Sequence, residues 1–280
     1  MSRVAIATCA GEDVDPDSRP LLDALAAQDV VGELARWDDP QVDWEHYDLV
    51  VIRSTWDYTP RRGEFLDWAK GRTRLANPYA AIEFSSDKHY LGVLAARGHR
   101  VVPSFFCDVG VAPQFPDADF VVKPSVGAGS MDAERYARHE VERATRHVAA
   151  LHERGRDALI QPYVASIDSE GERALVFIDG AFSHAIAKAA MLNVAEIDRH
   201  ALYRHEQTSL VEAEPDAVAF AGAVLEDVGF SGLLYARVDL VRVAEGWSIM
   251  ELELVEPSLF LTYHRDAATA LAAAIARRLT

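Results

Sequence analysis

The strongest constraint in the sequence is a hairpin near the C-terminal end, in which two strand-like runs flank a short turn centred at Glu245. Antiparallel pairing about this turn places Asp239 opposite Glu251 and Arg237 opposite Glu253. Side chains alternate between the two faces of a strand, so these four charged residues share one face. The other face carries four apolar residues, Val238, Leu240, Met250 and Leu252. The pattern predicts a sheet with one face in a core and one charged face.

The charged face brings three carboxylates, from Asp239, Glu251 and Glu253, within reach of one another. Like charges directly opposite on paired strands are destabilising unless a cation lies between them. Arg237 is one such cation, and Mg²⁺ held by carboxylate oxygens is another. The hairpin alone is equally compatible with a solvated sheet face of mixed charge.

The first third of the chain has the pattern of a parallel α/β unit. Residues 3–9 and 48–53 are typical of buried strands, and residues 20–27 between them have helical spacing. A further helix is expected over residues 63–70, ahead of a predicted helix N-cap at Ser85-Ser86-Asp87.

The rest of the chain predicts α+β structure with antiparallel hairpins. Asp179-Gly180 separates two strand-like runs and gives a strong hairpin signal. Residues 191–214 are expected to be a long irregular loop. The remaining predicted strands cover residues 100–106, 120–123, 158–164, 173–178 and 181–187, and the remaining helices 141–154, 215–228 and 267–276. We expect three domains: an α/β domain over 1–84, a small subdomain over 85–160 and a C-terminal subdomain over 161–280.

Composition excludes several classes of protein. Lys plus Arg is 28 and Asp plus Glu is 44, so the formal net charge is −16, which disfavours binding to nucleic acid or to an anionic membrane. The two cysteines exclude a disulfide scaffold and a four-thiolate metal site. No apolar run is long enough for a membrane span. A cytoplasmic protein is the expectation, and a homodimer is left open.

A strand that ends in Lys123 runs into a loop of small residues. Glycines let backbone N–H groups approach phosphate oxygens, and the lysine supplies positive charge. The loop is not a P-loop, because no Gly-Lys-Ser/Thr sequence closes it. The candidate phosphate-binding residues of the loop are Ser125, Gly127, Gly129 and Ser130.

Taken together, these elements resemble the ATP-grasp superfamily over roughly residues 85–265. The resemblance rests on their order: a helix-borne lysine, a strand-end lysine with a small-residue loop, a linker strand, and then the acidic hairpin. In this chain they are Lys88, Lys123 with residues 125–130, Gln161 to Val164, Asp239, and Glu251 with Glu253. Glu253 departs from the pattern, since the family usually has Asn there, but it still offers an oxygen ligand. Pro162 has no N–H to offer to adenine.

The resemblance implies an α+β ATP-grasp fold whose two subdomains grip ATP, together with a role for each matching residue. Lys88 and Lys123 would contact the ATP phosphates, and Glu172 the ribose. The adenine pocket would be lined by Gln161, Tyr163 and Val164, and Mg²⁺ would be held by Asp239, Glu251 and Glu253. The expected catalytic residues are Lys188, Arg237 and Arg53. Taken singly, Lys88 could be an exposed residue and Tyr163 a core aromatic.

Two further segments would determine the substrate. The first follows the predicted strand 48–53, and the carboxyl ends of parallel strands face the ligand crevice. The second follows the acidic hairpin directly. We expect Arg53 to clamp a carboxylate, unless it is paired with an acid such as Asp57, and the other expected substrate residues are Thr55, Trp56, Glu256 and Ser258.

The resemblance further implies an ATP- and Mg²⁺-dependent ligase that activates a small amino-acid carboxylate as an acyl phosphate for attack by nitrogen. The substrate segments are similar to those of the cyclo-ligases of D-cycloserine biosynthesis, which favours ring closure of O-ureido-D-serine. Two alternatives stay open: an intermolecular ligase resembling glutathione synthetase, and an ATP-binding protein without turnover. Residues 127–129 and 191–209 are expected to form lids that shield the acyl phosphate from water.

Overall fold

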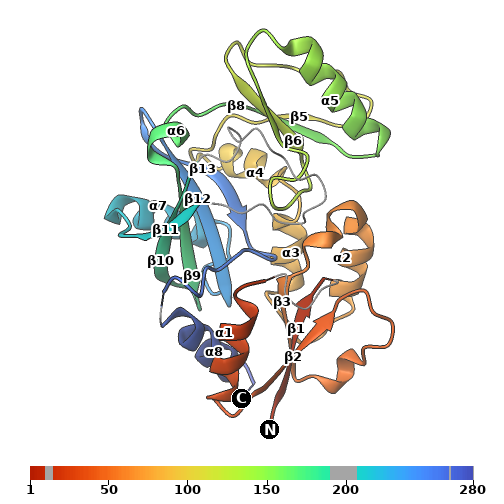
Figure 1. Ribbon diagram of the computed structural model, residues 1–280, viewed down its shortest axis with the longest axis vertical. Helices are drawn as coiled ribbons and strands as arrows, with labels where there is room; N and C mark the ends of the chain where they lie inside the picture. Colours follow the sequence, from red (N-terminus) through yellow and green to blue (C-terminus); the bar gives the residue numbers. More distant parts are fainter. Residues whose placement is uncertain (10–14, 190–206, 265, 280) are drawn as a thin grey trace.

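The computed structural model contains three β-sheets with helices packed around them (Figure 1). It describes residues 1–9, 15–189, 207–264 and 266–279. One sheet lies at the end of the molecule that carries both termini, one lies in the middle, and the third lies at the opposite end.

The N-terminal sheet is parallel and has the strand order β2-β1-β3-β4. Its strands are β1 (Arg3–Thr8), β2 (Val31–Arg36), β3 (Leu49–Ser54) and β4 (Leu75–Ala76). The largely buried β1 and the fully buried β3 were predicted from their apolar runs. The sequence analysis missed β2, because an edge strand with only one buried residue lacks such a run.

Helices cover both faces of this sheet. They are α1 (Ser18–Ala26) and α2 (Arg62–Lys70), with short 3₁₀ turns at Trp44–His46 and Trp56–Arg61. The C-terminal helix α8 (Ala267–Arg277) packs against α1, and its apolar face shares one core with β1 and with the middle sheet. The last helix of the chain therefore joins the first sheet to the second.

The middle sheet is antiparallel, in the order β11-β10-β9-β12-β13. Its strands are β9 (Glu172–Ile178), β10 (Ala181–Lys188), β11 (Thr208–Val211), β12 (Tyr235–Val243) and β13 (Gly246–Glu253). Helix α7 (Pro215–Asp227) packs on its apolar face. Strand β11 corrects the expectation of an irregular loop over 191–214, while residues 190–206 lie outside the described part of the chain.

The acidic hairpin has the predicted register over its charged residues. Arg237 pairs with Glu253 and Asp239 with Glu251. The register then shifts, because Leu240 pairs with Ile249 rather than with Met250. Strict alternation had placed Met250 on the apolar face, and this prediction is wrong: the bulge moves Met250 out of the ladder.

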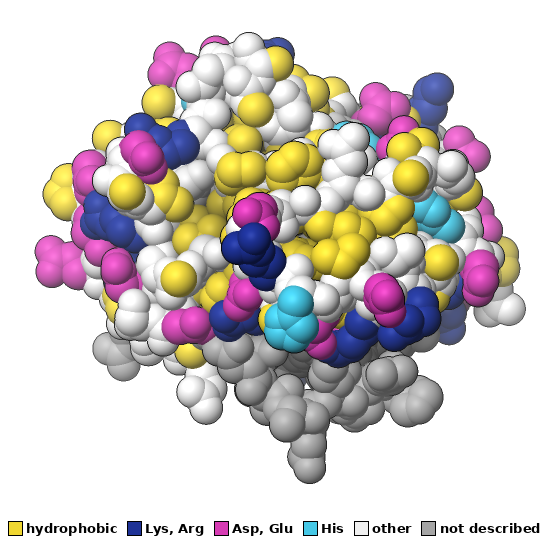
Figure 2. Space-filling view, turned by 90° about the horizontal axis from the view of Figure 1, so that it is seen from above, with side chains coloured by type: hydrophobic (Ala, Val, Ile, Leu, Met, Phe, Trp, Pro, Cys, Tyr) yellow, Lys and Arg dark blue, Asp and Glu magenta, His cyan; other side chains and the backbone are white. Residues whose placement is uncertain are grey.

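The third sheet has the order β5-β8-β6-β7 and is covered by α5 (Val141–Glu153). Its strands are β5 (Phe105–Cys107), β6 (Phe120–Pro124), β7 (Glu134–Tyr136) and β8 (Ala158–Pro162). The strand expected over 100–106 is reduced to β5 and an isolated bridge at Val101. Seen from this end, acidic and basic side chains are interspersed among hydrophobic patches, so no continuous area of one sign forms there (Figure 2).

Two short helices, α3 (Tyr79–Ser85) and α4 (Tyr90–Ala96), connect the N-terminal sheet to the third sheet, and α6 (Ile167–Glu170) follows β8. Lys88 lies between α3 and α4, so the expectation of a helix-borne lysine is wrong. Asp87 accepts a hydrogen bond from the backbone N–H of His89, and α4 begins only at Tyr90, which is later than the predicted N-cap implied. The lysine is consequently free to turn toward the cleft instead of following a helix face.

The architecture has the expected mixture of an α/β N-terminal part joined to two antiparallel sheets with helices. The domain boundaries at 84 and 160 stay a proposal. None of the described helices combines the length and the apolar character that a membrane crossing requires.

Candidate active site

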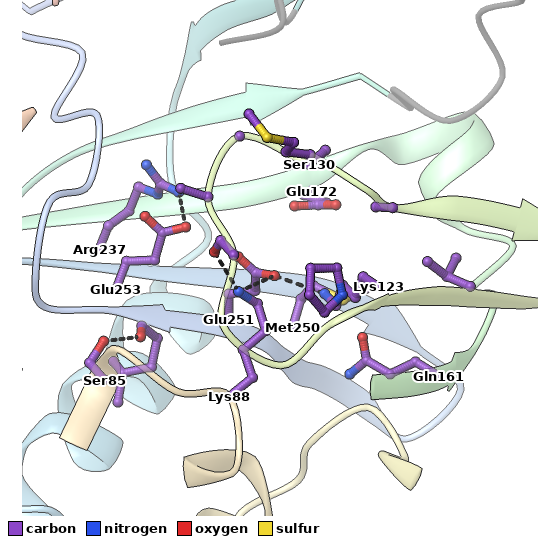
Figure 3. Close-up of a pocket in the computed structure, with 18 of the residues that line it drawn as sticks. Ser85, Lys88, Lys123, Ser130, Gln161, Glu172, Arg237, Met250, Glu251 and Glu253 are labelled. Carbon is purple, nitrogen blue, oxygen red and sulfur yellow. Dashed lines mark hydrogen bonds and ion pairs between the residues drawn. The ribbon is translucent and has the colours of Figure 1, made fainter. Parts of the chain in front are cut away.

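One pocket lies between the middle sheet and the third sheet, and most of the predicted site residues line it. The acidic hairpin forms one wall, and the third sheet with its glycine-rich loop forms the other (Figure 3). The predicted residues that line it are Trp56, Lys88, Lys123, Gly127, Gly129, Ser130, Gln161, Tyr163, Val164, Glu172, Lys188, Arg237, Glu251, Glu253, Glu256 and Ser258. Four predicted residues do not line it: Arg53, Thr55, Ser125 and Asp239.

The three carboxylates of the hairpin converge on one point. Asp239, Glu251 and Glu253 each offer an oxygen, and these atoms lie within 4.8 Å of one another. Asp239 is fully buried behind the other two, which face the pocket. A cluster of hard oxygen donors at this spacing has the chemistry that Mg²⁺ requires.

Cations surround this cluster in the structure. Arg237 donates to Asp239 at 2.8 Å and lies 2.6 Å from Glu253, and Lys188 donates to Asp239 at 2.7 Å. Burial acts to raise the pKa of Asp239, but Arg237 and Lys188 outweigh it and the pKa is lowered. Asp239 is therefore held as a carboxylate.

The two glutamates have opposite electrostatic surroundings. Burial would raise the pKa of Glu251, but Lys123 and Lys88 outweigh it and hold the pKa well below its usual range. The pKa of Glu253 is raised to about 8, because burial and the charges of Asp239 and Glu251 together outweigh the opposing effect of Arg237. A divalent cation at this point would relieve the repulsion that Glu253 experiences.

Two lysines reach the carboxylates from outside the middle sheet, one from β6 and one from the connection between α3 and α4. Lys123, on β6, donates to Glu251 at 2.8 Å, and the Nζ atom of Lys88 lies 3.8 Å from the same carboxylate (Figure 3). Lys88 also donates to the carbonyl of Gly127 at 3.0 Å, which ties it to the glycine-rich loop. Both ammonium groups thus lie between the loop and the carboxylates, where they can exchange a carboxylate partner for phosphate oxygens.

The glycine-rich loop curves over the pocket with unusual backbone geometry. Gly129 and Ser130 have φ values of 60° and 55°, in the left-handed region. Ser125 lies below the loop, where its backbone N–H donates to Asp157 and its carbonyl accepts from Lys88. Ser125 therefore anchors the loop and is not among the groups that face the pocket. The other predicted lid falls largely on residues 190–206, outside the described residues.

The inner end of the pocket has a mixed lining. Gln161 is buried and donates to Ser104 at 3.0 Å, while Tyr163 and Val164 follow β8 along the same wall. Glu172 pairs with Lys188 at 3.0 Å across neighbouring strands. This side combines apolar surface with a few polar groups, as nucleotide pockets do.

Arg53 does not lie where the sequence suggested. Its guanidinium turns away from the pocket and lies 3.5 Å from Asp17 and 3.7 Å from Asp15. Only 1% of Arg53 is exposed, and Thr55 beside it is fully buried. The expected pairing with an acid is observed, but with these two aspartates rather than with Asp57. Asp57 instead accepts a hydrogen bond from the indole of Trp37.

Arg53 binds a segment that we call the strap, residues 256–261, which begins three residues after the last residue of β13. It donates to the strap carbonyl of Pro257 at 3.0 Å, and the indole of Trp56 donates to that of Glu256 at 3.0 Å. Arg237 and His184 hold the next two carbonyls, and Asp17 accepts from the backbone N–H groups of Leu259 and Leu261. Side chains from the N-terminal sheet and from the middle sheet thus fix the backbone that carries Glu256 and Ser258.

Glu256 projects into the pocket as a carboxyl group that is separate from the carboxylate cluster. Its hydrogen-bond partner is the hydroxyl of Tyr58, whose ring stacks on Phe65 with centroids 4.4 Å apart. Burial raises the pKa of Glu256 to about 7, and the hydrogen bond from Tyr58 partly opposes this shift.

The sequence analysis missed several lining residues, among them Met250, Tyr90 and Ser85. Met250 reaches the pocket through the bulge, and no feature of the sequence marks a bulge there. Tyr90 accepts a hydrogen bond from the backbone N–H of Leu252, and the hydroxyl of Ser85 donates to the carbonyl of Leu252 and accepts from the backbone N–H of Leu254. These contacts brace the acidic hairpin, and they depend on a long-range packing that local patterns do not encode.

Comparison with known proteins places the chain in a family. Residues 4–77 match the family model described as the N-terminal domain of D-cycloserine synthetase DcsG. A curated relative from Streptomyces lavendulae, "Cycloserine biosynthesis protein DcsG", is 38% identical over 284 residues that cover 95% of each chain. The chain belongs to the DcsG family.

Solved structures agree with this family assignment. The crystal structure of D-cycloserine synthetase DcsG superposes with a TM-score of 0.89 at 37% identity, over 100% of both chains. The D-alanine–D-alanine ligase from Bacillus anthracis complexed with ATP has a TM-score of 0.70 at 13% identity, over 100% of this chain and 97% of that one. The ATP-grasp ligase PsnB complexed with minimal precursor has a TM-score of 0.63 at 16% identity, over 99% of both chains, so the chain has the fold of ATP-grasp ligases. Together with the DcsG relatives, this confirms the expectation of an ATP-grasp ligase.

Proposed function

We propose that the protein is an ATP- and Mg²⁺-dependent ligase that closes O-ureido-D-serine into D-cycloserine. The observation that carries the proposal is the pocket in which two lysines meet a carboxylate cluster beneath a glycine-rich loop. The similarity to the DcsG relative over 95% of both chains supports the choice of substrate.

The residues of the pocket divide the chemistry between them. Lys88 and Lys123 would leave Glu251 and hold the transferred phosphate, since phosphoryl transfer depends on charge neutralisation and alignment. Asp239, Glu251 and Glu253 would hold Mg²⁺, which supplies charge neutralisation at the phosphates. Lys188 and Arg237, beside this cluster, would stabilise the acyl phosphate.

The nucleotide and the amino acid would occupy different ends of the pocket. Gln161, Tyr163 and Val164 would line the adenine site, and Glu172 would contact the ribose. The strap residues Glu256 and Ser258, with Trp56 nearby, would surround the amino acid. We propose that Arg53 acts on this end indirectly, because it holds the strap and does not face the pocket.

The test is a reaction of the purified protein with ATP, Mg²⁺ and O-ureido-D-serine, with products identified by mass. We expect ADP, phosphate and D-cycloserine to form together, with the carbamoyl group of the substrate released by water as ammonia and carbon dioxide, and none of these products in quantity without Mg²⁺. A parallel panel of pairs of small amino acids tests the intermolecular alternative. Phosphate release only with a pair, together with a dipeptide mass, would replace ring closure by two-substrate ligation.

A further inference from the structure

A nitrogen nucleophile of the kind proposed here must lose a proton during attack. In O-ureido-D-serine the nitrogen that closes the ring is amide-like, so it has no basic lone pair and needs a base. An effective general base has a pKa near the working pH and lies within the substrate pocket. The carboxylates of Asp239, Glu251 and Glu253 are paired with lysine or arginine side chains, which leaves them poorly suited to accept a proton from the nitrogen.

Glu256 satisfies these requirements by its position. It lines the pocket next to the cluster, only 9% of it is exposed, and it is outside the group of three carboxylates that converge on one point. Its backbone is fixed by the indole of Trp56 at 3.0 Å. The carboxyl group is thus held at the amino-acid end of the pocket by a rigid segment.

The groups around Glu256 come from three elements. The Tyr58 hydroxyl, from the 3₁₀ turn 56–61, is its hydrogen-bond partner, and the charges of Lys88 and of Arg237 on β12 also act on it. Tyr58 is 3% exposed and its ring is stacked on Phe65, so its position is fixed. All three groups favour the carboxylate, while burial opposes it.

We propose, building on the function proposed above, that Glu256 is the general base that removes the proton from the attacking nitrogen, with Tyr58 as its positioning residue. In this step the nitrogen forms a bond to the acyl carbon and its N–H proton passes to the carboxylate oxygen of Glu256. The bond between the acyl carbon and the phosphate oxygen breaks, and inorganic phosphate leaves with the electron pair. The ring nitrogen still carries the carbamoyl group of the substrate, and hydrolysis of this group by water to ammonia and carbon dioxide completes D-cycloserine.

The first test separates activation from ring closure in Glu256→Gln, which keeps the size of the side chain and removes the base. Activation is measured with hydroxylamine, which traps the acyl phosphate as a hydroxamate and attacks without a base because it is already a neutral amine. We expect ring closure to fall at least about 100-fold, the range found for general bases. Hydroxamate formation should stay within a few-fold of wild type, as should both rates in the matched control Glu245→Gln at the exposed hairpin turn.

The second test uses Tyr58→Phe, which does not depend on the behaviour of the first variant. Loss of the hydroxyl removes a hydrogen bond that lowers the pKa of Glu256, so the acid limb of kcat/KM for ring closure should move to higher pH. A role in packing alone would lower the rate without moving this limb.

Four results would overturn the inference or part of it. Ring closure in Glu256→Gln within a few-fold of wild type would exclude Glu256 as the base, and so would a parallel loss of hydroxamate formation. An acid limb that stays in place in Tyr58→Phe would exclude the positioning role. A wild-type protein that forms neither hydroxamate nor ring product would overturn the proposed function itself, and the inference with it.

Discussion

Two buried charge clusters in this protein differ in the ratio of cations to carboxylates: cations are in excess in one, and carboxylates in the other. On the acidic hairpin, four cations surround three carboxylates, and the pKa values of Asp239 and Glu251 are lowered. At the edge of the N-terminal sheet, Arg53 faces two aspartates, and burial together with the charge of Asp15 raises the pKa of Asp17 although Arg53 opposes this. The first cluster lines the pocket and the second does not.

The difference indicates what each cluster can do. Lys123 and Lys88 reach the hairpin from outside its own sheet and can exchange a carboxylate for phosphate oxygens, so an excess of cations suits a binding site. The contacts of Arg53 and Asp17 run to fixed backbone groups of the strap. The cluster of Arg53 with its two aspartates therefore holds the strap between the N-terminal sheet and the middle sheet. It acts on the reaction only by fixing the position of the strap.

The largest expected effect is on stability, in Arg53→Met. The substitution leaves Asp15 and Asp17 buried without a cation, and breaking a buried pair in this way costs about 3 kcal/mol or more of unfolding free energy. Urea denaturation measures it, with Arg19→Met as the control, because the Arg19 pair is exposed and contributes under about 0.5 kcal/mol. An unchanged unfolding free energy with a raised KM for the amino acid would make Arg53 a substrate residue after all.

On the hairpin, Glu251→Gln should act on the reaction and not on the fold. The amide loses the negative charge that we assign to metal binding, so kcat should fall by about 100-fold or more, or ~3 kcal/mol. Steady-state kinetics over a range of Mg²⁺ concentrations checks this, and the melting temperature should change little. Wild-type turnover in this variant would refute the metal assignment.

A smaller effect is expected for Lys123→Ala, which removes a cation from the pocket wall. The KM for ATP should rise by about tenfold to 100-fold, because one phosphate contact and its charge are lost. The exposed Lys70 at the end of α2 provides the control variant, for which no change is expected. If nucleotide affinity and turnover both stay normal, Lys123 is a structural partner of Glu251 and the two clusters are alike.

The smallest effect concerns the pH dependence of stability. The pKa of Glu256 is raised to about 7 in the folded protein, from an ordinary value of 4.5. Between these values the folded state binds more protons than the unfolded state, so this group makes stability fall as pH rises through that window. Glu256→Gln should flatten the fall by about 1 to 2 kcal/mol between pH 5 and pH 8, measured by denaturation at both values. A steeper fall in the variant would contradict the raised pKa.

The sequence predicted the parts of this protein that depend on local periodicity. The pairing of Asp239 with Glu251 follows from the turn and from alternation, and the buried strands β1 and β3 follow from their apolar runs. The bulge at Met250, the edge strand β2 and the direction of the Arg53 side chain could not be predicted. Each depends on which distant surface packs against the element, and Arg53 in particular is oriented by residues more than 30 positions away on one side and 200 on the other.

The strap has a consequence for how the substrate range of such an enzyme can change. Four successive carbonyls, from Glu256 to Leu259, are each bound by a side chain from a different part of the molecule. These hydrogen bonds are to main-chain atoms, so the strap backbone is held in place without help from the strap side chains that face the pocket. Replacing Ser258 by a larger or smaller residue should therefore alter which amino acids fit the pocket while the backbone of the strap keeps its position. This position can consequently diverge between relatives, or be redesigned, without loss of the fold.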